Sequence, residues 1–302
     1  MKVLTTLAGC AALAMLNLAN VAQAQIVYSG TTVGEATFNR PIDNGLSAPT
    51  TLSGVGTAVP YQARTFTVST TGNYDLASIS GDPSTFDNYT VLYQGAFDPA
   101  APLTNAVRAN DDDNDTVGIS GFIGQTLTAG QSYTLVTTGY ENVDAGAFDN
   151  SIRLQSVFQT GTTVGGPTWD PFGEGEDVSY SALTFTVNVS GLYNFGSVSD
   201  GFDNYVLLYE DTFDPTQPGL NLLNENDDSP VVGRSGFLGQ QLTAGTTYHF
   251  VTTGFDQTEA GAFTNTISGP GTLTPVPAPS GLAVMGLPAL IGVGVMLRRR
   301  HK

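Results

Sequence analysis

Hydrophobic and polar residues alternate with a period of two over many short stretches of this chain. Residues 64–69 and 133–137 alternate in this way, and residues 89–93 are apolar on both faces. Gly- and Asn-containing turn signals separate these stretches, and no stretch of the body combines a 3.6-residue period with helix caps. The alternation predicts strands with one buried face, and residues 89–93 predict a central strand. Short strands at regular spacing indicate an all-β fold of the sandwich or jelly-roll type.

The body of the chain is an internal duplication, because short motifs recur in it in an unchanged order. The matching segments include 65–68 with 184–187, 86–89 with 202–205, 110–112 with 226–228, and 127–130 with 242–245. Each unit is long enough to be a complete domain rather than a solenoid repeat. The sequence therefore predicts two tandem β-sandwich domains, residues 25–156 and 157–272, of which the first has a longer loop at 41–60.

The charge of the body limits its partners. The chain has 27 acidic and 10 basic residues, and five of the basic residues lie at its two ends, so the body carries a net charge of −22. Such a surface repels nucleic acid, and we expect no nucleic-acid partner. It favours cations, including calcium. The chain has one cysteine, Cys10, near its start, so the body has neither disulfides nor thiolate metal sites.

The N-terminal residues 1–24 have the organisation of a signal peptide. A single basic residue, Lys2, precedes a largely apolar stretch, and a small-x-small pattern ends at Ala24. This pattern predicts cleavage by signal peptidase between Ala24 and Gln25 and export across the inner membrane. An alternative is a lipoprotein signal, since residues 7–10 match a lipoprotein box ending at Cys10. The long apolar stretch after Cys10 favours the first interpretation.

The C-terminal residues consist of three consecutive segments. Residues 273–280 form a Pro-rich linker, residues 281–297 are uncharged and apolar, and residues 298–302 are basic. As a helix, the apolar segment would span about 25 Å, which suffices for a thin bilayer. It predicts one transmembrane helix that anchors the chain in the membrane. The basic tail, with its stop signal at Arg298, Arg299 and Arg300, is predicted to stay in the cytoplasm.

This order of segments resembles the PEP-CTERM sorting signal, which exosortases of Gram-negative bacteria recognise. The corresponding motif comprises Val276, Pro277, Ala278 and Pro279, with Ala278 where the signal usually has Glu. The resemblance implies an exosortase-like partner, sorting through the tail, and delivery to the cell surface or to an extracellular matrix such as a biofilm. The alternative is a plain single-span anchor.

The two repeats also resemble bacterial pre-peptidase C-terminal domains, which are secreted jelly rolls. The resemblance is carried by the Phe-Asp-Asn-Tyr start of the central strand, its Leu-Tyr end, the Asn-Asp-Asp loop and the Leu-Thr-Ala-Gly turn. It implies an accessory, non-catalytic module.

Two acidic loops are the strongest candidates for chemistry. Clustered carboxylates repel one another unless a cation or full solvation relieves them, and calcium takes six to eight oxygen ligands. The sequence predicts calcium ligands among the acidic residues of the two loops and the acids that precede the two central strands: Asp111, Asp112, Asp113, Asp115 and Asp87 in the first repeat, and Asp227, Asp228 and Asp203 in the second. The alternative is that both loops are solvated turns. Neither has the spacing of an EF-hand.

Catalysis has little support in the sequence. The body contains one histidine, His249, which aligns with Thr134 of the first repeat, and it lacks the Gly-x-Ser-x-Gly elbow of many hydrolases. We therefore expect a non-enzymatic, structural or adhesive protein of the envelope or extracellular matrix. Two alternatives stay open. One is a calcium-dependent module that binds extracellular polysaccharide, and the other is a secreted hydrolase that uses paired carboxylates.

Overall fold

The computed structural model describes residues 25–114 and 116–277. Asp115, the predicted signal peptide up to Ala24, and the tail from Ala278 onward, with the predicted transmembrane helix, lie outside the described residues. Gln25 is the first residue of the first strand. Strands joined by turns make up the described residues, and within them no helix meets the length and apolar character that crossing a membrane requires.

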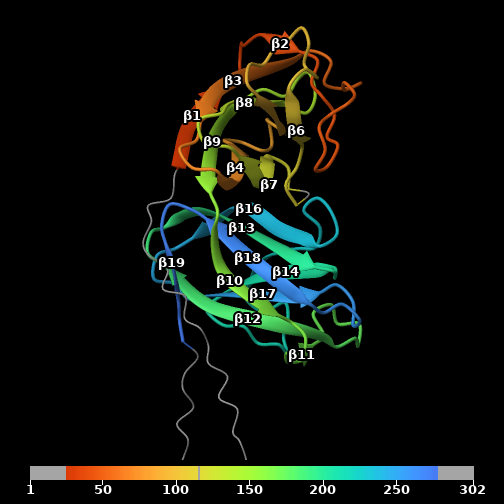
Figure 1. Ribbon diagram of the computed structural model, residues 1–302, viewed down its shortest axis with the longest axis vertical. Coiled ribbons are helices and arrows are strands. Elements are labelled where there is room, and N and C mark those ends of the chain that lie inside the picture. The colour runs from red at the N-terminus through yellow and green to blue at the C-terminus, as the bar shows by residue number, and fades with distance from the viewer. Residues whose placement is uncertain (1–24, 115, 278–302) are drawn as a thin grey trace, which may run out of the picture.

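The first part of the chain folds into two antiparallel sheets, coloured red to green in Figure 1. Its strands are β1 (Gln25–Thr31), β2 (Thr37–Phe38), β3 (Val59–Thr67), β4 (Gly72–Ser80), β5 (Asn88–Gln94), β6 (Ala106–Asn110), β7 (Ile119–Leu127), β8 (Ser132–Gly139) and β9 (Ala147–Leu154). One sheet has the order β1-β9-β4-β7 and the other β2-β3-β8-β5-β6. We call these strands the first sandwich.

The second part repeats this topology. Its strands are β10 (Ser156–Thr162), β11 (Thr168–Trp169), β12 (Val178–Val187), β13 (Gly191–Asp200), β14 (Asn204–Glu210), β15 (Leu222–Asn226), β16 (Arg234–Leu242), β17 (Tyr248–Gly254), β18 (Ala262–Ser268) and β19 (Leu273–Pro275). The sheets have the orders β10-β18-β13-β16 and β11-β12-β17-β14-β15, so each strand of the first sandwich has a counterpart nine strands later. This second sandwich also pairs β19 with the edge of β12. The residues of β19 were predicted to belong to the linker.

The all-β prediction is confirmed by the strand pairings, and the burial pattern explains the apolar central strand. Leu92 of β5 packs between the two sheets with Phe66, Phe122 and Leu135. The alternate residues of β5, which include Val91, point to the other face of their sheet, where they form a second apolar cluster with Phe38 under the loops. A strand buried on both faces is mostly apolar, and its buried Thr90 forms a hydrogen bond with Ser120 Oγ at 2.7 Å.

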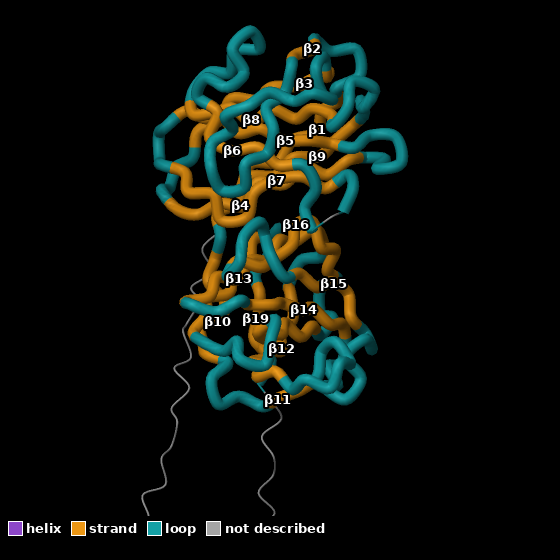
Figure 2. The backbone as a smooth tube through the Cα atoms, turned by 90° about the vertical axis from the view of Figure 1, so that its right-hand side faces the viewer, coloured by secondary structure: helices purple, strands orange, loops and turns teal. Residues whose placement is uncertain are grey.

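The two sandwiches pack against each other through equivalent strands (Figure 2). β4 and β7 of the first contact their counterparts β13 and β16 of the second. A Cβ on Gly121 would lie 2.8 Å from Leu238 Cδ1, and a Cβ on Gly236, the counterpart of Gly121, would lie 3.1 Å from Ile123 Cδ1. Each sandwich therefore inserts an aliphatic side chain over a glycine of the other, and the interface is nearly two-fold symmetric.

A buried carboxylate, Asp75, lies in this interface. Its oxygens accept hydrogen bonds from Gly124 N at 3.0 Å, Gln155 Nε2 at 2.7 Å and Ser268 Oγ at 2.7 Å. The counterpart of Asp75 in the second sandwich is Asn194, whose Nδ2 donates to the same Ser268 Oγ at 3.1 Å. Burial raises the pKa of Asp75 from 3.8 to about 6, although all three hydrogen bonds oppose this rise. The charged form of Asp75 is therefore unfavourable in the folded protein.

We predict that Asp75→Asn flattens the pH dependence of stability. Between pH 3.8 and about 6, the unfolded chain loses the Asp75 proton while the folded protein keeps it, so the free energy of unfolding falls as the pH rises. The fall amounts to about 3 kcal/mol at 1.36 kcal/mol per pKa unit. The amide of the variant would have no proton to lose, and Asn194 shows that an amide can donate to Ser268.

Urea unfolding at pH 4 and pH 8 measures this effect. The free energy of unfolding of Asp75→Asn minus that of wild type should be larger at pH 8 than at pH 4. For Asp177→Asn, at an exposed carboxylate, this difference should be the same at both pH values. Parallel pH profiles for wild type and Asp75→Asn would show that the Asp75 carboxylate has no raised pKa.

Candidate metal centres

The first acidic side chain of each candidate centre stands immediately before a central strand. Asp87 precedes β5 between two anchored residues: Phe86 is buried, and Asn88 Nδ2 donates to Ser78 O at 3.0 Å and to Ser78 Oγ at 2.9 Å. The backbone oxygen of Asp87 accepts a hydrogen bond from Tyr140 N at 2.9 Å. These contacts of Asp87 and its two neighbours therefore fix the position of Asp87 at the start of β5.

The other two acids of each centre follow the neighbouring edge strand, β6 or β15. Asn110, at the end of β6, accepts a hydrogen bond from Gly121 N at its Oδ1, at 2.9 Å. Its counterpart Asn226 accepts one from Gly236 N at 2.7 Å. These two asparagines tie the acidic loops to β7 and β16. Because β5 and β6 are adjacent and antiparallel, the end of β6 lies beside the start of β5.

This arrangement brings together three of the predicted acids in each sandwich. The first centre contains Asp87, Asp111 and Asp112, and the second contains Asp203, Asp227 and Asp228. Within each centre, one carboxylate oxygen from every residue lies within 4.8 Å of the others. The sequence placed these acids in two loops and ahead of two strands, and the fold makes each set a single cluster.

Burial and mutual repulsion make ionisation of these acids costly. Burial raises the pKa of Asp111 to about 7, and the neighbouring Asp112 and Asp87 contribute to this rise. Burial and acidic neighbours likewise raise the pKa of Asp87 to about 6. In the second centre, burial and the acidic neighbours raise the pKa of Asp227 to about 6 and also raise that of Asp203.

Several carboxylate oxygens of the two centres also lack hydrogen bonds. The Oδ1 atoms of Asp87, Asp111, Asp203 and Asp227 are shielded from solvent and accept no hydrogen bond from the described residues. A buried acceptor without a partner is expensive, and proteins rarely keep one that serves no purpose. These oxygens are suited to a cation.

The residues of each centre fit a hard divalent cation. Calcium binds oxygen at about 2.3–2.6 Å, so two oxygens on one ion lie at most about 5 Å apart. The oxygens of each centre satisfy this limit. Each set of three acids offers carboxylate oxygens, whereas structural zinc prefers nitrogen and sulfur ligands. When bound, the ion would neutralise the acids, and water or backbone carbonyls would complete its ligands.

Of the two other predicted ligands, Asp115 lies outside the described residues, and the structure does not bring Asp113 into the first centre. Asp113 is buried on the opposite side of the loop, where its Oδ2 accepts a hydrogen bond from Leu238 N at 2.6 Å. Leu238 belongs to β16, so Asp113 joins the interface between the sandwiches. Burial raises the pKa of Asp113 to about 7. The chain turns at Asp113, whose backbone N donates to Ile119 O at 2.7 Å and whose backbone oxygen accepts from Thr116 N at 3.0 Å, and beyond this turn its side chain faces β16.

The side chains that pack behind each centre were not predicted from the sequence. In the first sandwich, the Arg40 guanidinium stacks on two rings, with its Cζ 4.0 Å from the centroid of Tyr89 and 4.7 Å from that of Tyr140. The positive charge of Arg40 partly offsets the raised pKa values of Asp87 and Asp111.

In the second sandwich an aromatic ring takes the place of this guanidinium. Phe172 packs against Tyr205 and Phe255, with ring centroids 5.2 Å and 5.8 Å away. Tyr205 and Phe255 are the counterparts of Tyr89 and Tyr140 in the duplication. Pro171, not Phe172, aligns with Arg40, so only a comparison of the two loops in space reveals this replacement.

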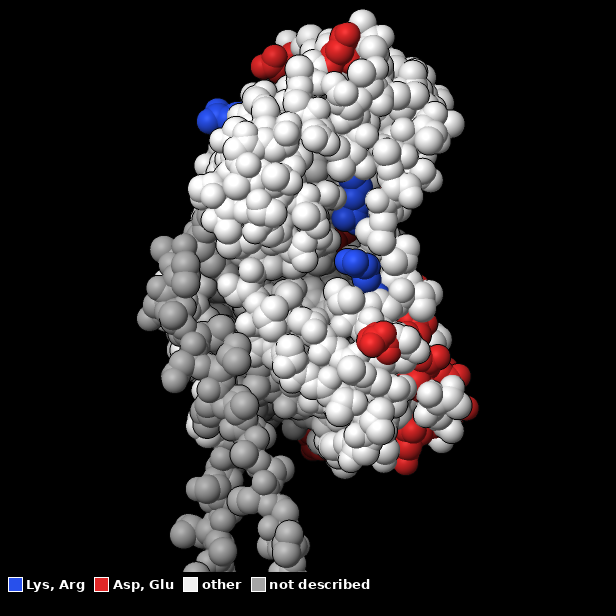
Figure 3. All heavy atoms as spheres, in the orientation of Figure 1, with Lys and Arg blue, Asp and Glu red and all other residues white. Residues whose placement is uncertain are grey.

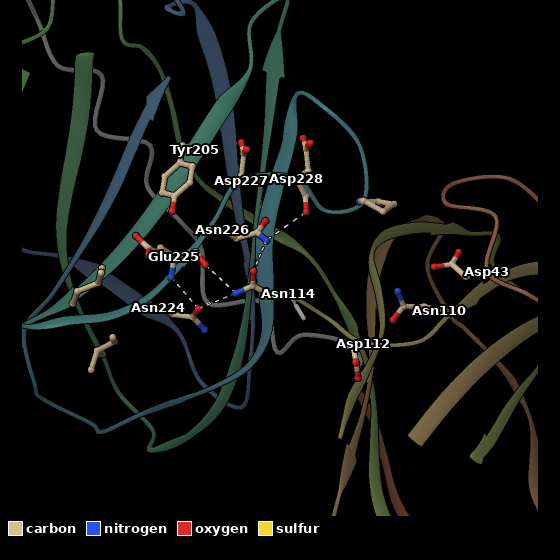
Figure 4. Close-up of a pocket in the computed structure, with 13 residues that line it drawn as sticks. Asp43, Asn110, Asp112, Asn114, Tyr205, Asn224, Glu225, Asn226, Asp227 and Asp228 are labelled. Atoms are coloured by element: carbon tan, nitrogen blue, oxygen red, sulfur yellow. Dashed lines mark hydrogen bonds between the residues drawn. The ribbon is translucent and has the colours of Figure 1, made fainter. Parts of the chain in front are cut away.

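A polar cleft of about 810 Å³ opens between the sandwiches, and both centres reach it. Asp112 contributes from the first centre, and Asp227 and Asp228 contribute from the second (Figure 4). Asn114 spans its floor: its Nδ2 donates to Glu225 O at 2.9 Å and its Oδ1 accepts from Asn226 Nδ2 at 2.7 Å. On the face shown in Figure 3, acidic side chains gather on the second sandwich, with others at the top of the first, and basic side chains lie where the sandwiches meet and at the left edge of the first sandwich.

Comparison with known proteins assigns no family. No protein-family model matches the chain, and no curated protein matches it. One solved structure, the VP2 subviral particle of infectious bursal disease virus, has 10% sequence identity and a TM-score of 0.16 over 83% of this chain and 72% of its own. The Gt strain of the same virus gives a TM-score of 0.14 at 10% identity, over 83% and 74%. At scores this low, neither protein supports an inference about fold or function.

We predict that removing one acid from a centre changes stability in opposite directions with and without calcium. At pH 8 in chelator, Asp111→Asn or Asp227→Asn should raise the melting temperature, because each relieves the repulsion. The rise should be roughly 2–4 °C, which corresponds to about 1 kcal/mol in a protein of this size. In millimolar calcium the same substitutions should lower it, because each removes a ligand of an ion that stabilises the folded state by mass action.

Differential scanning calorimetry of the full-length protein in detergent checks this reversal. Asp177→Asn, at an exposed acid outside both centres, is the control and should leave both melting temperatures unchanged. If the Asp111 and Asp227 variants shift the melting temperature in the same direction in calcium and in chelator, the acids form no calcium site.

Proposed function

We propose that the chain is an exported, non-catalytic structural or adhesive protein of the bacterial envelope or extracellular matrix, and that calcium ions stabilise its two sandwiches. One observation carries the proposal: the same set of three crowded carboxylates recurs at equivalent positions in both sandwiches. A single acidic turn is common on protein surfaces. A duplicated set in which four Oδ1 atoms, those of Asp87, Asp111, Asp203 and Asp227, accept no hydrogen bond from the described residues supports an ion-binding role.

The geometry favours an ion site over a carboxylate-based hydrolase. Retaining glycosidases separate their two carboxyl groups by about 5–5.5 Å and inverting ones by about 6.5–9.5 Å, so that a sugar or a water fits between them. Here the oxygens of three carboxylates lie within 4.8 Å of one another. That spacing suits one shared cation and is much shorter than the separation of an inverting pair.

The histidine supports a structural role as well. His249 is the only histidine between residues 25 and 277. Its Nδ1 lies 3.0 Å from Thr184 Oγ1 and its Nε2 lies 3.2 Å from Asp211 O, so both ring nitrogens are engaged in hydrogen bonds. A general base needs a free nitrogen within reach of a substrate proton.

The two terminal sequences support export and sorting. The signal peptide sends the body through the inner membrane, and the tail, with Val276, Pro277, Ala278 and Pro279 ahead of an apolar segment and Arg298–Arg300, addresses it to an exosortase-like enzyme. Outside the cell, calcium is abundant. A body without cysteine would gain from calcium the stability that other exported proteins gain from disulfides.

We predict that residues 276–302 determine where the protein is delivered. In a Gram-negative host with an exosortase, the full-length chain should reach the cell surface or the medium with its tail removed. A chain that ends at Pro275 should accumulate in the periplasm, because the sorting enzyme has nothing to recognise. Cell fractionation with antibodies against the sandwiches measures both.

Replacement of Arg298, Arg299 and Arg300 by Gln is the finer control, since it keeps the apolar segment. It should reduce delivery and leave export intact. Equal surface delivery of the full-length and the shortened chain would contradict sorting through this tail.

A further inference from the structure

The two sandwiches differ in the aromatic patch behind each metal centre, and this difference affects which ligands can bind there. In the first sandwich this patch is Tyr89 and Tyr140, and in the second it is Tyr205 and Phe255. The first patch is covered by Arg40 and its loop, whereas in the second patch Tyr205 is 8% exposed and Phe255 is 50% exposed. The cation centres beside them contain the same three acids.

The cover of the first patch is Arg40 together with the loop 41–58. Arg40 is 2% exposed, its backbone N donates to Gly56 O at 3.0 Å, and its backbone oxygen accepts from Ser53 N at 2.8 Å. Its Nε donates to Tyr140 O at 2.9 Å. A Cβ on Gly56 would lie 2.6 Å from Arg40 Nε, which shows how closely the loop packs on this side chain. No ligand can stack on these rings without displacing Arg40.

The second patch has a short loop in place of this cover. Asp170 holds the loop through its two carboxylate oxygens, which accept hydrogen bonds from Gly173 N and Gly175 N at 2.7 Å each. The left-handed conformations of both glycines, with φ of 72° and 81°, allow this tight arrangement. The loop presents Phe172, which is 40% exposed, beside Phe255, which is 50% exposed. Phe172 on this loop and Phe255, which follows β17, together form an exposed aromatic surface on which a ring can stack.

This surface adjoins the second cation centre. Phe255 N donates to the backbone oxygen of Asp203 at 3.0 Å, so the residue that carries the ring is tied directly to the acid. Tyr205 lies two residues after Asp203 on β14, and in Figure 4 its hydroxyl points toward Glu225 at the wall of the cleft. Tyr205, Asp227 and Asp228 all line that cleft. Phe172 contacts Tyr205, so the exposed rings lie next to the cleft that Asp227 and Asp228 line.

We propose that the second sandwich, but not the first, binds a neutral polysaccharide, with a sugar ring stacked on Phe255 and Phe172 and its hydroxyl groups coordinated to the cation held by Asp203, Asp227 and Asp228. This inference rests on the proposed calcium centre and adds the ligand class and its position. Aromatic faces pack against the apolar faces of sugars, and calcium accepts hydroxyl oxygens in place of water. The net charge of −17 opposes anionic polysaccharides.

Affinity electrophoresis of the full-length protein in detergent tests the inference. The gels contain galactomannan, dextran or xyloglucan as neutral probes and alginate as the anionic probe, in calcium or in chelator. We expect a neutral probe to retard the protein in calcium and not in chelator. Phe255→Ala should weaken this binding at least roughly tenfold, the effect of losing about 1.4 kcal/mol of binding free energy. Tyr140→Ala, the matched truncation in the first sandwich, should bind as wild type.

Calcium uptake measured on the same samples separates this inference from the proposed cation centre. Phe255→Ala should take up as much calcium as wild type, which also shows that it is folded. The inference is overturned if calcium uptake is normal but no neutral probe binds, if alginate binds more strongly, or if Phe255→Ala binds the probe like wild type. If wild type takes up no calcium, the cation centre fails, and this inference fails with it.

Discussion

Repulsion among three carboxylates at one end of each sandwich is the constraint around which the site is built. At an effective dielectric constant of about 20, two charges about 5 Å apart repel by about 3 kcal/mol. The fold nevertheless holds Asp87, Asp111 and Asp112 together through the pairing of β5 with β6 and through the hydrogen bond from Gly121 N to Asn110. Such a cluster, held twice, is relieved by a counter-charge, and we propose that a calcium ion supplies it.

The same loop serves the centre and the interface between the sandwiches. Asp111 and Asp112 face the cluster, whereas Asp113 and Asn114 form hydrogen bonds with Leu238 and Glu225 of the second sandwich. The contacts of Gly121 and Gly236 are nearly two-fold symmetric, whereas the hydrogen bonds of Asp75 are not. This loop also breaks the symmetry, because the second repeat has Ser229 and Pro230 at the matching positions. The two sandwiches are thus chemically distinct partners despite their common topology.

Much of this architecture follows from the sequence, because strand periodicity is visible within a short segment and duplication is visible when the sequence is compared with itself. The apolar stretch 89–93 predicted a central strand, and the duplication anticipated the repeated strand order. The acids before each central strand could be predicted to lie near the acidic loops, because consecutive antiparallel strands bring the start of one beside the end of the next. Calcium itself stays a prediction. Contacts between distant segments could not be predicted: the burial of Asp113 against β16, the pairing of β19 with β12, and the exchange of Arg40 for Phe172 all depend on how surfaces meet.

The stoichiometry of calcium binding tests the central claim most directly. Isothermal titration calorimetry of the full-length protein at pH 8 should give two ions per chain. Asp227→Asn should remove one of them and leave the centre at Asp87, Asp111 and Asp112 intact. Absence of calcium binding in the wild-type protein, or binding that the loss of Asp227 leaves unchanged, would contradict the account.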